Sequence, residues 1–177
     1  ALTREIKDTI EQDSHAVREK YLNDPGIDLY EEWTSFIDEQ TLQVGNEHIT
    51  GDHIIIATGS RPKIPPIPGL DETPYMTSTD ALYREDLPQR LIVIGGGYIG
   101  VELGHAYHAL GSEVHFLVRN RMIAFEDEEV IDAFEAYFRK DHHVHQNINI
   151  TGTSYDEHSG EITVSYSDQE GNTHHIR

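Results

Sequence analysis

Three glycines at a fixed spacing follow a run of apolar residues in the middle of the chain. Gly95, Gly97 and Gly100 match the pattern G-x-G-x-x-G directly after Leu91-Ile-Val-Ile94. The first glycine allows a sharp turn, the second lets the backbone approach a pyrophosphate, and the third lets a helix pack closely on the preceding strand. The N–H groups and dipole at the start of that helix attract phosphates. We therefore expect this loop to bind a dinucleotide, the alternative being glycines that serve only the turn.

The residues around these glycines have a βαβ pattern of about thirty residues. Arg90-Leu-Ile-Val-Ile94 is typical of a fully buried parallel strand, and Glu113-Val-His-Phe-Leu-Val118 of a second strand. A helix is expected between them, ending at Gly111. Its predicted apolar face comprises Ile99, Leu103, Ala106, Tyr107 and Leu110.

Composition restricts the classes of function. Of 177 residues, 32 are acidic and 13 basic, so the formal net charge is −19. This charge disfavours nucleic acid or an anionic membrane surface as a partner. The acidic composition resembles that of proteins from a high-salt cytoplasm, with an ordinary acidic protein as the alternative. The chain has no cysteine, so it supplies no thiol chemistry. The sequence shows neither a signal segment nor a membrane-length apolar run, which predicts a cytoplasmic location.

The first half of the chain is expected to be a helix followed by short strands. Residues 3–22 have a charged helical pattern with one narrow apolar stripe. His53-Ile-Ile-Ile-Ala57 is typical of an apolar strand that ends in the turn Thr58-Gly59-Ser60-Arg61. Further short strands are predicted at 27–30, 34–37, 41–44 and 47–50.

Prolines dominate the segment after this turn and predict a stiff, extended passage between two domains. We place the domain boundary between residues 75 and 76. Capping residues at 77–80 precede a short predicted helix at 81–85. The prolines are Pro62, Pro65, Pro66, Pro68 and Pro74, with Pro88 further along.

The last third of the chain is expected to hold one helix and several strands. Residues 127–140 have helical periodicity, a strand is predicted at 144–151, and residues 161–167 and 173–177 form a predicted β-hairpin. The predicted apolar face of the helix comprises Val130, Ile131, Phe134, Tyr137 and Phe138.

Histidines cluster at two places in this last third. His142, His143 and His145 form one group, and His174 and His175 the other. Adjacent residues point to opposite faces of a strand, and no cysteine completes a ligand set. We expect solvated polar side chains and no metal site.

Three blocks of sequence together resemble the flavin-dependent pyridine nucleotide-disulfide oxidoreductases, which include dihydrolipoamide dehydrogenase and glutathione, mycothione and mercuric reductases. The blocks are residues 53–62 with Ile67-Pro68-Gly69, residues 77–82 with 87–102, and Gly111-Ser-Glu-Val114 with Phe125-Glu-Asp127. The resemblance covers nearly the whole chain. It implies part of an FAD-binding domain at 1–75, followed at 76–177 by an α/β, Rossmann-like NAD(P)-binding domain that is incomplete at its C-terminus.

The resemblance further implies that the chain is the central portion of a longer protein. Family members carry a flavin loop and a Cys-x4-Cys redox pair upstream of the first block. They also have a dimerisation domain downstream that supplies a His-Glu acid/base pair. We expect a homodimer for the full-length protein, and an inactive fragment without catalytic residues for this portion alone.

Individual positions take expected roles from the same resemblance. Tyr98 resembles the aromatic residue that covers the flavin until the nicotinamide cofactor displaces it. Glu102 resembles the acid that contacts the nicotinamide end, and Ile99 lies in the same NAD(P)-binding motif. The turn Ala57, Thr58, Gly59 would contact FAD through its backbone. The simpler alternatives are a packed aromatic, an acid favoured by the helix dipole, and a tight turn.

The end of the second strand distinguishes NADH from NADPH. An acid there binds the ribose 2′-hydroxyl, whereas a guanidinium binds a 2′-phosphate through two hydrogen bonds. Arg119 occupies this place, and Arg121 follows. NADPH-specific relatives carry a second arginine where this chain has Ile123-Ala124, so Arg121 would act instead. NADP is the expected cofactor, with NAD as the alternative.

The sequence thus predicts the NAD(P)H-binding central portion of a flavoprotein. The full-length enzyme would pass hydride from NADPH through FAD to a small-molecule disulfide or a metal ion. A non-catalytic dinucleotide-binding module is the alternative.

Overall fold

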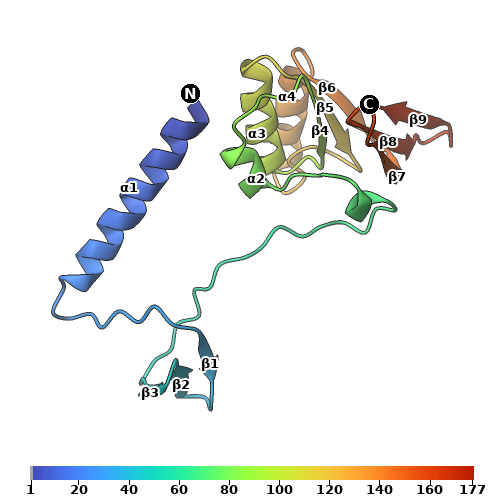
Figure 1. Ribbon diagram of the computed structural model, residues 1–177. Coiled ribbons are helices and arrows are strands. Elements are labelled where there is room, and N and C mark those ends of the chain that lie inside the picture. The colour runs from blue at the N-terminus through green and yellow to red at the C-terminus, as the bar shows by residue number, and fades with distance from the viewer. Residues whose placement is uncertain (1) are drawn as a thin grey trace. The chain divides into compact units, whose positions relative to one another are not determined.

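A computed structural model describes residues 2–177, with side chains from residue 4 onward. The chain forms two compact units, residues 1–61 and 62–177. It combines helices with one parallel and two antiparallel three-stranded sheets (Figure 1), which confirms the predicted α/β class. Within the described residues, no helix has the combination of length and hydropathy that a membrane crossing requires.

The first unit holds one long helix and a small antiparallel sheet. Near the end of the helix, the Arg18 guanidinium donates two hydrogen bonds to the Glu31 carboxylate at 2.8 and 2.7 Å, so the helix is tied to the loop that follows it. The elements are α1 (Leu2–Leu22), β1 (Thr34–Phe36), β2 (Thr41–Val44) and β3 (Glu47–Thr50).

Two predicted strands of this unit do not form. Residues 27–30 and 53–57 pair with no other strand in the described part of the chain. Ile55 and Ile56 are 87% and 70% exposed. A strand needs a neighbour for its backbone N–H and C=O groups, so an apolar run without a partner remains irregular. The strand prediction was wrong for both segments.

The second unit is built around a parallel sheet in the order β4-β5-β6. Its strands are β4 (Arg90–Ile94), β5 (Glu113–Val118) and β6 (His143–Gln146). Helices α3 (Tyr98–Ala109) and α4 (Glu128–Phe138) pack on one face. The predicted βαβ arrangement is therefore present. β4 is only half-buried, however, because it lies at an edge with β5 as its single partner among the described strands.

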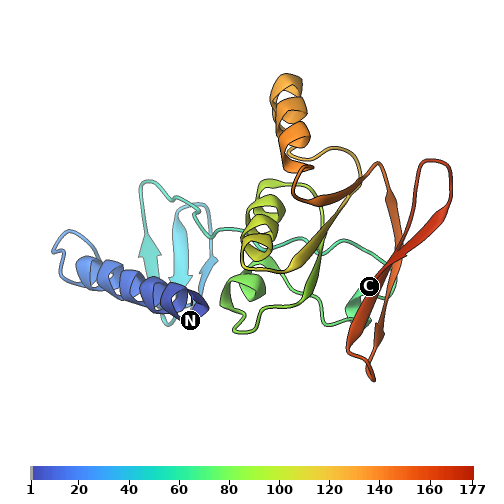
Figure 2. The same cartoon turned by 90° about the horizontal axis from the view of Figure 1, so that it is seen from above.

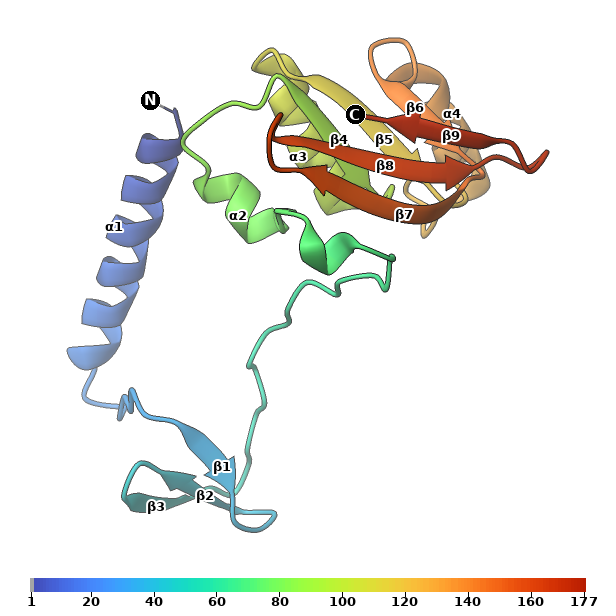
Figure 3. The same ribbon diagram turned by 45° about the vertical axis from the view of Figure 1, so that its right-hand side comes forward.

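An antiparallel meander covers the other face of the parallel sheet. Figure 2 shows α3, the parallel sheet and the meander as successive layers, and Figure 3 shows the meander in front of the sheet. β8 and β9 form the predicted hairpin. The strands are β7 (Asn149–Asp156), β8 (Glu161–Ser167) and β9 (Thr173–Ile176).

Alternating side chains of β5 enter two separate cores. Val114, Phe116 and Val118 pack against the helices, and the Phe116 ring meets Phe138 edge-on at 5.1 Å between ring centroids. Leu117 points to the opposite face, where it packs with Ile148, Val164 and Tyr166. Both faces of β5, the middle strand of the parallel sheet, are therefore covered.

The segment before the parallel sheet is held by local and distant contacts. The 3-10 turn Leu70–Glu72 buries Leu70, and the Thr153 N–H donates to the Pro68 carbonyl at 2.8 Å. Helix α2 (Ser78–Tyr83) begins earlier than predicted. The reason is that the Asp80 carboxylate accepts the Thr77 backbone N–H at 2.8 Å, which completes a capping box.

Helix α3 forms where the sequence predicts it, and Tyr107 of the predicted face is buried, but the rest of the buried face differs from the prediction. Val101, Gly104 and Tyr107 are buried, whereas Ile99 and Leu110 are exposed. The glycine-bearing side can approach the sheet more closely than a side of larger residues, so close packing selected the buried face.

Two further predictions need correction in the last third. In α4, Ile131 and Phe138 are buried but Val130 and Tyr137 are exposed, so the apolar face is narrower than predicted. The strand predicted at 144–151 is two strands, β6 and β7. Asn147 separates them with φ of 57°, a left-handed conformation that asparagine tolerates better than most residues.

Candidate dinucleotide-binding site

The glycine loop lies where β4 ends and α3 begins. Gly95 has φ of 113°, which strongly favours glycine, and its N–H donates to the Leu117 carbonyl at 2.9 Å. Gly97 is the N-cap of α3, and a Cβ placed on it would meet no atom within 4 Å. The backbone at the helix start is therefore open to a ligand, next to N–H groups that bind anions.

Other glycines of this region serve packing. A Cβ on Gly100 would lie 3.1 Å from Val93 Cγ1, in agreement with the close helix-strand contact expected there. Sequence reasoning missed Gly96 and Gly104, whose added Cβ atoms would lie 2.8 Å from Val118 Cγ1 and 2.7 Å from Phe116 Cε1. The four-residue spacing of Gly100 and Gly104, which places both on one helical face, was the available signal.

Three predicted site residues lie on the first turns of α3. Tyr98, Ile99 and Glu102 are all exposed. The Tyr98 hydroxyl donates a hydrogen bond to the Glu126 carboxylate, just before α4. This bond, together with desolvation, raises the pKa of Tyr98. The ring of Tyr98, which is predicted to cover the flavin, is thereby held against the segment that leads into α4.

Arg119 directly follows β5 and is exposed. Within the part of the chain that the structure describes, its guanidinium has no ion pair or hydrogen bond. It lines a shallow pocket of about 250 Å³ together with Asn120, residues 147–149 and residues 167–169. Arg119 is therefore a cation available to an anionic ligand near the ends of the parallel strands.

Arg121 is engaged differently. Its guanidinium donates to Asp132 at 2.6 Å and Glu135 at 2.8 Å, both on α4, and these hydrogen bonds raise the pKa of Arg121. Burial opposes ionisation of Glu135. Even so, hydrogen bonds from Arg121, Gln146 and the Met122 N–H lower its pKa. Arg121 thus tethers its loop to α4, and the structure does not bring the two predicted arginines together in one role.

The predicted flavin-side turn belongs to the first unit. Ala57, Thr58 and Gly59 are exposed in irregular backbone. Gly59 has φ of 72°, and an added Cβ would have no neighbour within 4 Å. By themselves these residues form an open turn, whose backbone is accessible to another group.

The histidines are more structured than expected. His142 is buried, with its ring stacked on Phe138 at 3.9 Å between centroids, and burial lowers its pKa. His145 lies in hydrogen-bonding distance of His115 and Tyr166. His174 Nε2 lies 2.7 Å from the Asp168 carboxylate. The expectation of solvated side chains was wrong for His142, which fills space in the helix-side core.

The chain has an α/β fold with a glycine loop between β4 and α3, and sequence comparison identifies its family. The family model described as pyridine nucleotide-disulphide oxidoreductase matches residues 3–176, and the chain belongs to this family. It is 40% identical over 161 residues to mercuric reductase of Staphylococcus aureus, covering 87% of this chain and 28% of that protein. It is 41% identical over 151 residues to mercuric reductase of Bacillus cereus, covering 81% and 23%. The chain thus spans about a quarter of the length of these relatives.

Solved structures of related proteins agree with this family. The chain is similar to the HOCl-induced flavoprotein disulfide reductase RclA from Escherichia coli, in its Cu(II) complex. The TM-score is 0.75 at 27% identity, covering 98% of this chain and 40% of RclA. The Cu(II) complex of a cysteine-to-serine mutant of RclA gives a TM-score of 0.76 at 28% identity, covering 98% of this chain and 41% of the mutant.

Proposed function

We propose that residues 76–177 bind NADPH and that, in a protein of its relatives' length, this chain is the central part of an FAD-dependent reductase. The observation that most supports this proposal is the backbone geometry at the start of α3. Gly95 turns the backbone at positive φ, and Gly97 leaves the helix N-terminus without an obstructing neighbour. These features fit a pyrophosphate at the helix N-terminus.

Arg119 is the residue we propose for choosing NADPH over NADH. It is exposed at the end of β5, it lines a pocket, and it has no competing partner among the described residues. A free guanidinium can donate two parallel hydrogen bonds to a phosphate. Because Arg121 is held by two carboxylates of α4, the proposal rests on Arg119 alone.

The electron-transfer partners in the proposed enzyme follow its relatives. Those proteins are named as mercuric reductases and as a flavoprotein disulfide reductase. We propose that bound NADPH reduces FAD, that Ala57, Thr58 and Gly59 contact FAD through their backbone, and that residues 1–75 belong to the FAD-binding part. The final acceptor would be a small-molecule disulfide or a metal ion. We also retain the homodimer and cytoplasmic location as predictions.

Titration of the 177-residue chain with NADPH and NADH tests the cofactor proposal. We expect saturable binding with NADPH preferred, monitored by calorimetry or by nicotinamide fluorescence. Arg119→Ala should reduce the ratio of NADPH affinity to NADH affinity. Arg4→Ala, which removes an equal charge from the exposed helix α1, should leave this ratio unchanged. Equal affinity for the two cofactors, or tighter NADH, would overturn the role of Arg119.

A non-catalytic dinucleotide-binding module is the second candidate, because the open start of α3 fits a pyrophosphate without any redox group. NADPH oxidation by the full gene product with FAD present separates the two. Turnover with a disulfide or Hg(II) supports the reductase. Tight NADPH binding without turnover of either acceptor supports the module.

A further inference from the structure

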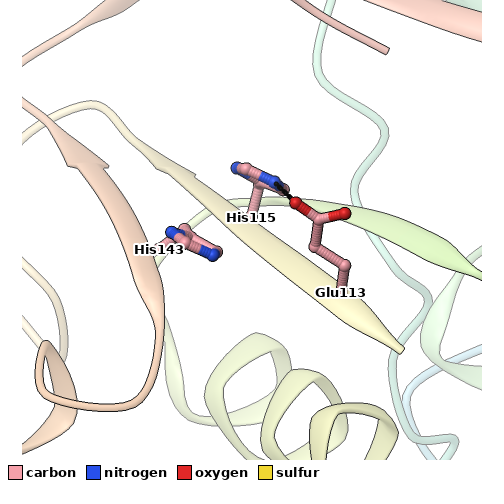
Figure 4. Close-up of side chains that lie close together, drawn as sticks. All are labelled: Glu113, His115 and His143. Carbon is pink, nitrogen blue, oxygen red and sulfur yellow. Dashed lines mark hydrogen bonds and ion pairs between the residues drawn. The ribbon is translucent and has the colours of Figure 1, made fainter. Parts of the chain in front are cut away.

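Three side chains gather at the amino ends of β5 and β6. Glu113 is the first residue of β5, His143 is the first residue of β6, and His115 lies opposite His143 in the parallel register. Side chains alternate along a strand, so Glu113 and His115 share one face. One ligand atom from each residue lies within 4.8 Å of the other two. Figure 4 shows His115 between Glu113 and His143.

We propose that Glu113, His115 and His143 bind a divalent first-row transition-metal ion such as Zn²⁺, Ni²⁺ or Cu²⁺. Two imidazoles and one carboxylate suit these ions, whereas Mg²⁺ prefers oxygen ligands. Metal–ligand bonds of about 2.0–2.2 Å place tetrahedral ligand atoms roughly 3.4 Å apart. Because Glu113 and His143 are exposed, rotation of their side chains can close the remaining distance and leave a position for water.

His115 is already oriented for such a role. Its Nδ1 lies 3.3 Å from His145 Nε2, and His145 Nδ1 lies 3.1 Å from the Tyr166 hydroxyl. Its side chain is only 17% exposed, so its ring has little freedom to turn away. A histidine whose second nitrogen is hydrogen bonded has a fixed ring orientation, as metal-binding histidines usually do.

The remaining nitrogen of His115 faces the proposed ion. Nε2 lies 3.1 Å from Glu113 Oε1, so the two ligand atoms already point at one another. An ion beside them would accept a lone pair from Nε2 and another from Oε1. The proton of His115 then lies on Nδ1 and is donated to His145 Nε2, and His145 carries its own proton on Nδ1 and donates it to the Tyr166 hydroxyl, so no proton is lost from the three side chains. Binding would therefore exchange one hydrogen bond for two metal–ligand bonds and join β5 to β6 through His143.

This site is separate from the dinucleotide loop. The loop follows the carboxyl end of β4. Glu113 and His143 lie at the amino ends of β5 and β6, at the opposite end of the parallel strands. The inference therefore does not depend on the proposed cofactor. A net charge of −19 attracts cations unspecifically, so the choice among cations matters in the test.

Calorimetric titration of the chain with Zn²⁺, Ni²⁺ and Mg²⁺ tests the proposal. We expect the tightest Zn²⁺ site to have a stoichiometry of one, with affinity reduced about tenfold or more in each of Glu113→Gln, His115→Ala and His143→Ala. With Cu²⁺ as probe, electron paramagnetic resonance should show coupling to two imidazole nitrogens, and to one in His143→Ala. NADPH affinity should stay unchanged in Glu113→Gln.

Two matched histidine variants serve as controls. His158→Ala removes a 99% exposed side chain in the turn between β7 and β8. His105→Ala disrupts the separate contact of His105 with His142 at 3.2 Å. Both should retain wild-type Zn²⁺ affinity. Unchanged affinity in Glu113→Gln and His143→Ala overturns the proposal, as does equally tight Mg²⁺ binding. Both positions are exposed, so these two variants decide the matter even if His115→Ala fails to fold.

Discussion

Gly104 of α3 and Phe116 of β5 lie so close that a Cβ on Gly104 would come within 2.7 Å of the Phe116 Cε1 atom. Both residues are buried in the helix-side core. We expect Gly104→Ala to lower the free energy of unfolding by about 1–3 kcal/mol, because overpacking outweighs the better helix propensity of alanine. Urea unfolding measures the loss. In a double-mutant cycle Phe116→Leu should be less costly in the Gly104→Ala background, and strict additivity would contradict the contact.

Gly97→Ala should separate binding from folding. The φ of Gly97 is −78° and an added Cβ meets no atom within 4 Å, so the change in unfolding free energy should stay below about 1 kcal/mol. Dinucleotide affinity should fall about tenfold or more, because the methyl group occupies the approach of the pyrophosphate. Calorimetry with NADPH, alongside thermal unfolding of the same sample, tests both halves. Retained affinity would show that the phosphates bind elsewhere.

Arg119 and Arg121 should respond in opposite ways to the same substitution. Arg119→Ala should weaken NADPH binding by roughly tenfold and leave NADH affinity unchanged, because only NADPH carries the 2′-phosphate. Arg121→Ala should leave the cofactor preference unchanged. It should lower the thermal unfolding temperature, since it removes a partner of Glu135, whose side chain is only 13% exposed. If Arg121→Ala changes the preference for NADPH over NADH, Arg121 binds the 2′-phosphate together with Arg119, as the sequence predicts.

Asp168 should confer a pH dependence on the loop between β8 and β9. The hydrogen bond from His174 leads the causes that lower the pKa of Asp168 from 3.8 to about 2. Because the folded-state pKa lies below the unfolded value, its stabilising effect is complete above about pH 4 and is lost as pH falls through about 2. Carboxyl NMR titration should show this low value, moving upward in His174→Ala. His158→Ala, in another turn, should leave the titration of Asp168 unchanged.

Local sequence was sufficient for the features that depend on neighbouring residues. The βαβ unit, α1, the hairpin of β8 and β9, and the turn at Gly95 all form where expected. Turn and helix boundaries follow from backbone freedom at glycine and from capping residues such as Asp80, and these act within a few positions. The roles of Tyr98, Glu102 and the flavin-side turn stay predictions, because they concern ligands rather than chain geometry.

Contacts between distant segments decided the rest. Only packing of α3 on β5 revealed that Gly104 rather than Ile99 faces the sheet, and only the position of α4 engaged Arg121 with Glu135. The parallel register of β5 and β6 placed His115 beside His143. The sequence by itself determined which residues turn, cap and span a strand. The tertiary structure decided which side chains meet, because strand pairing and close packing join residues that no local pattern connects.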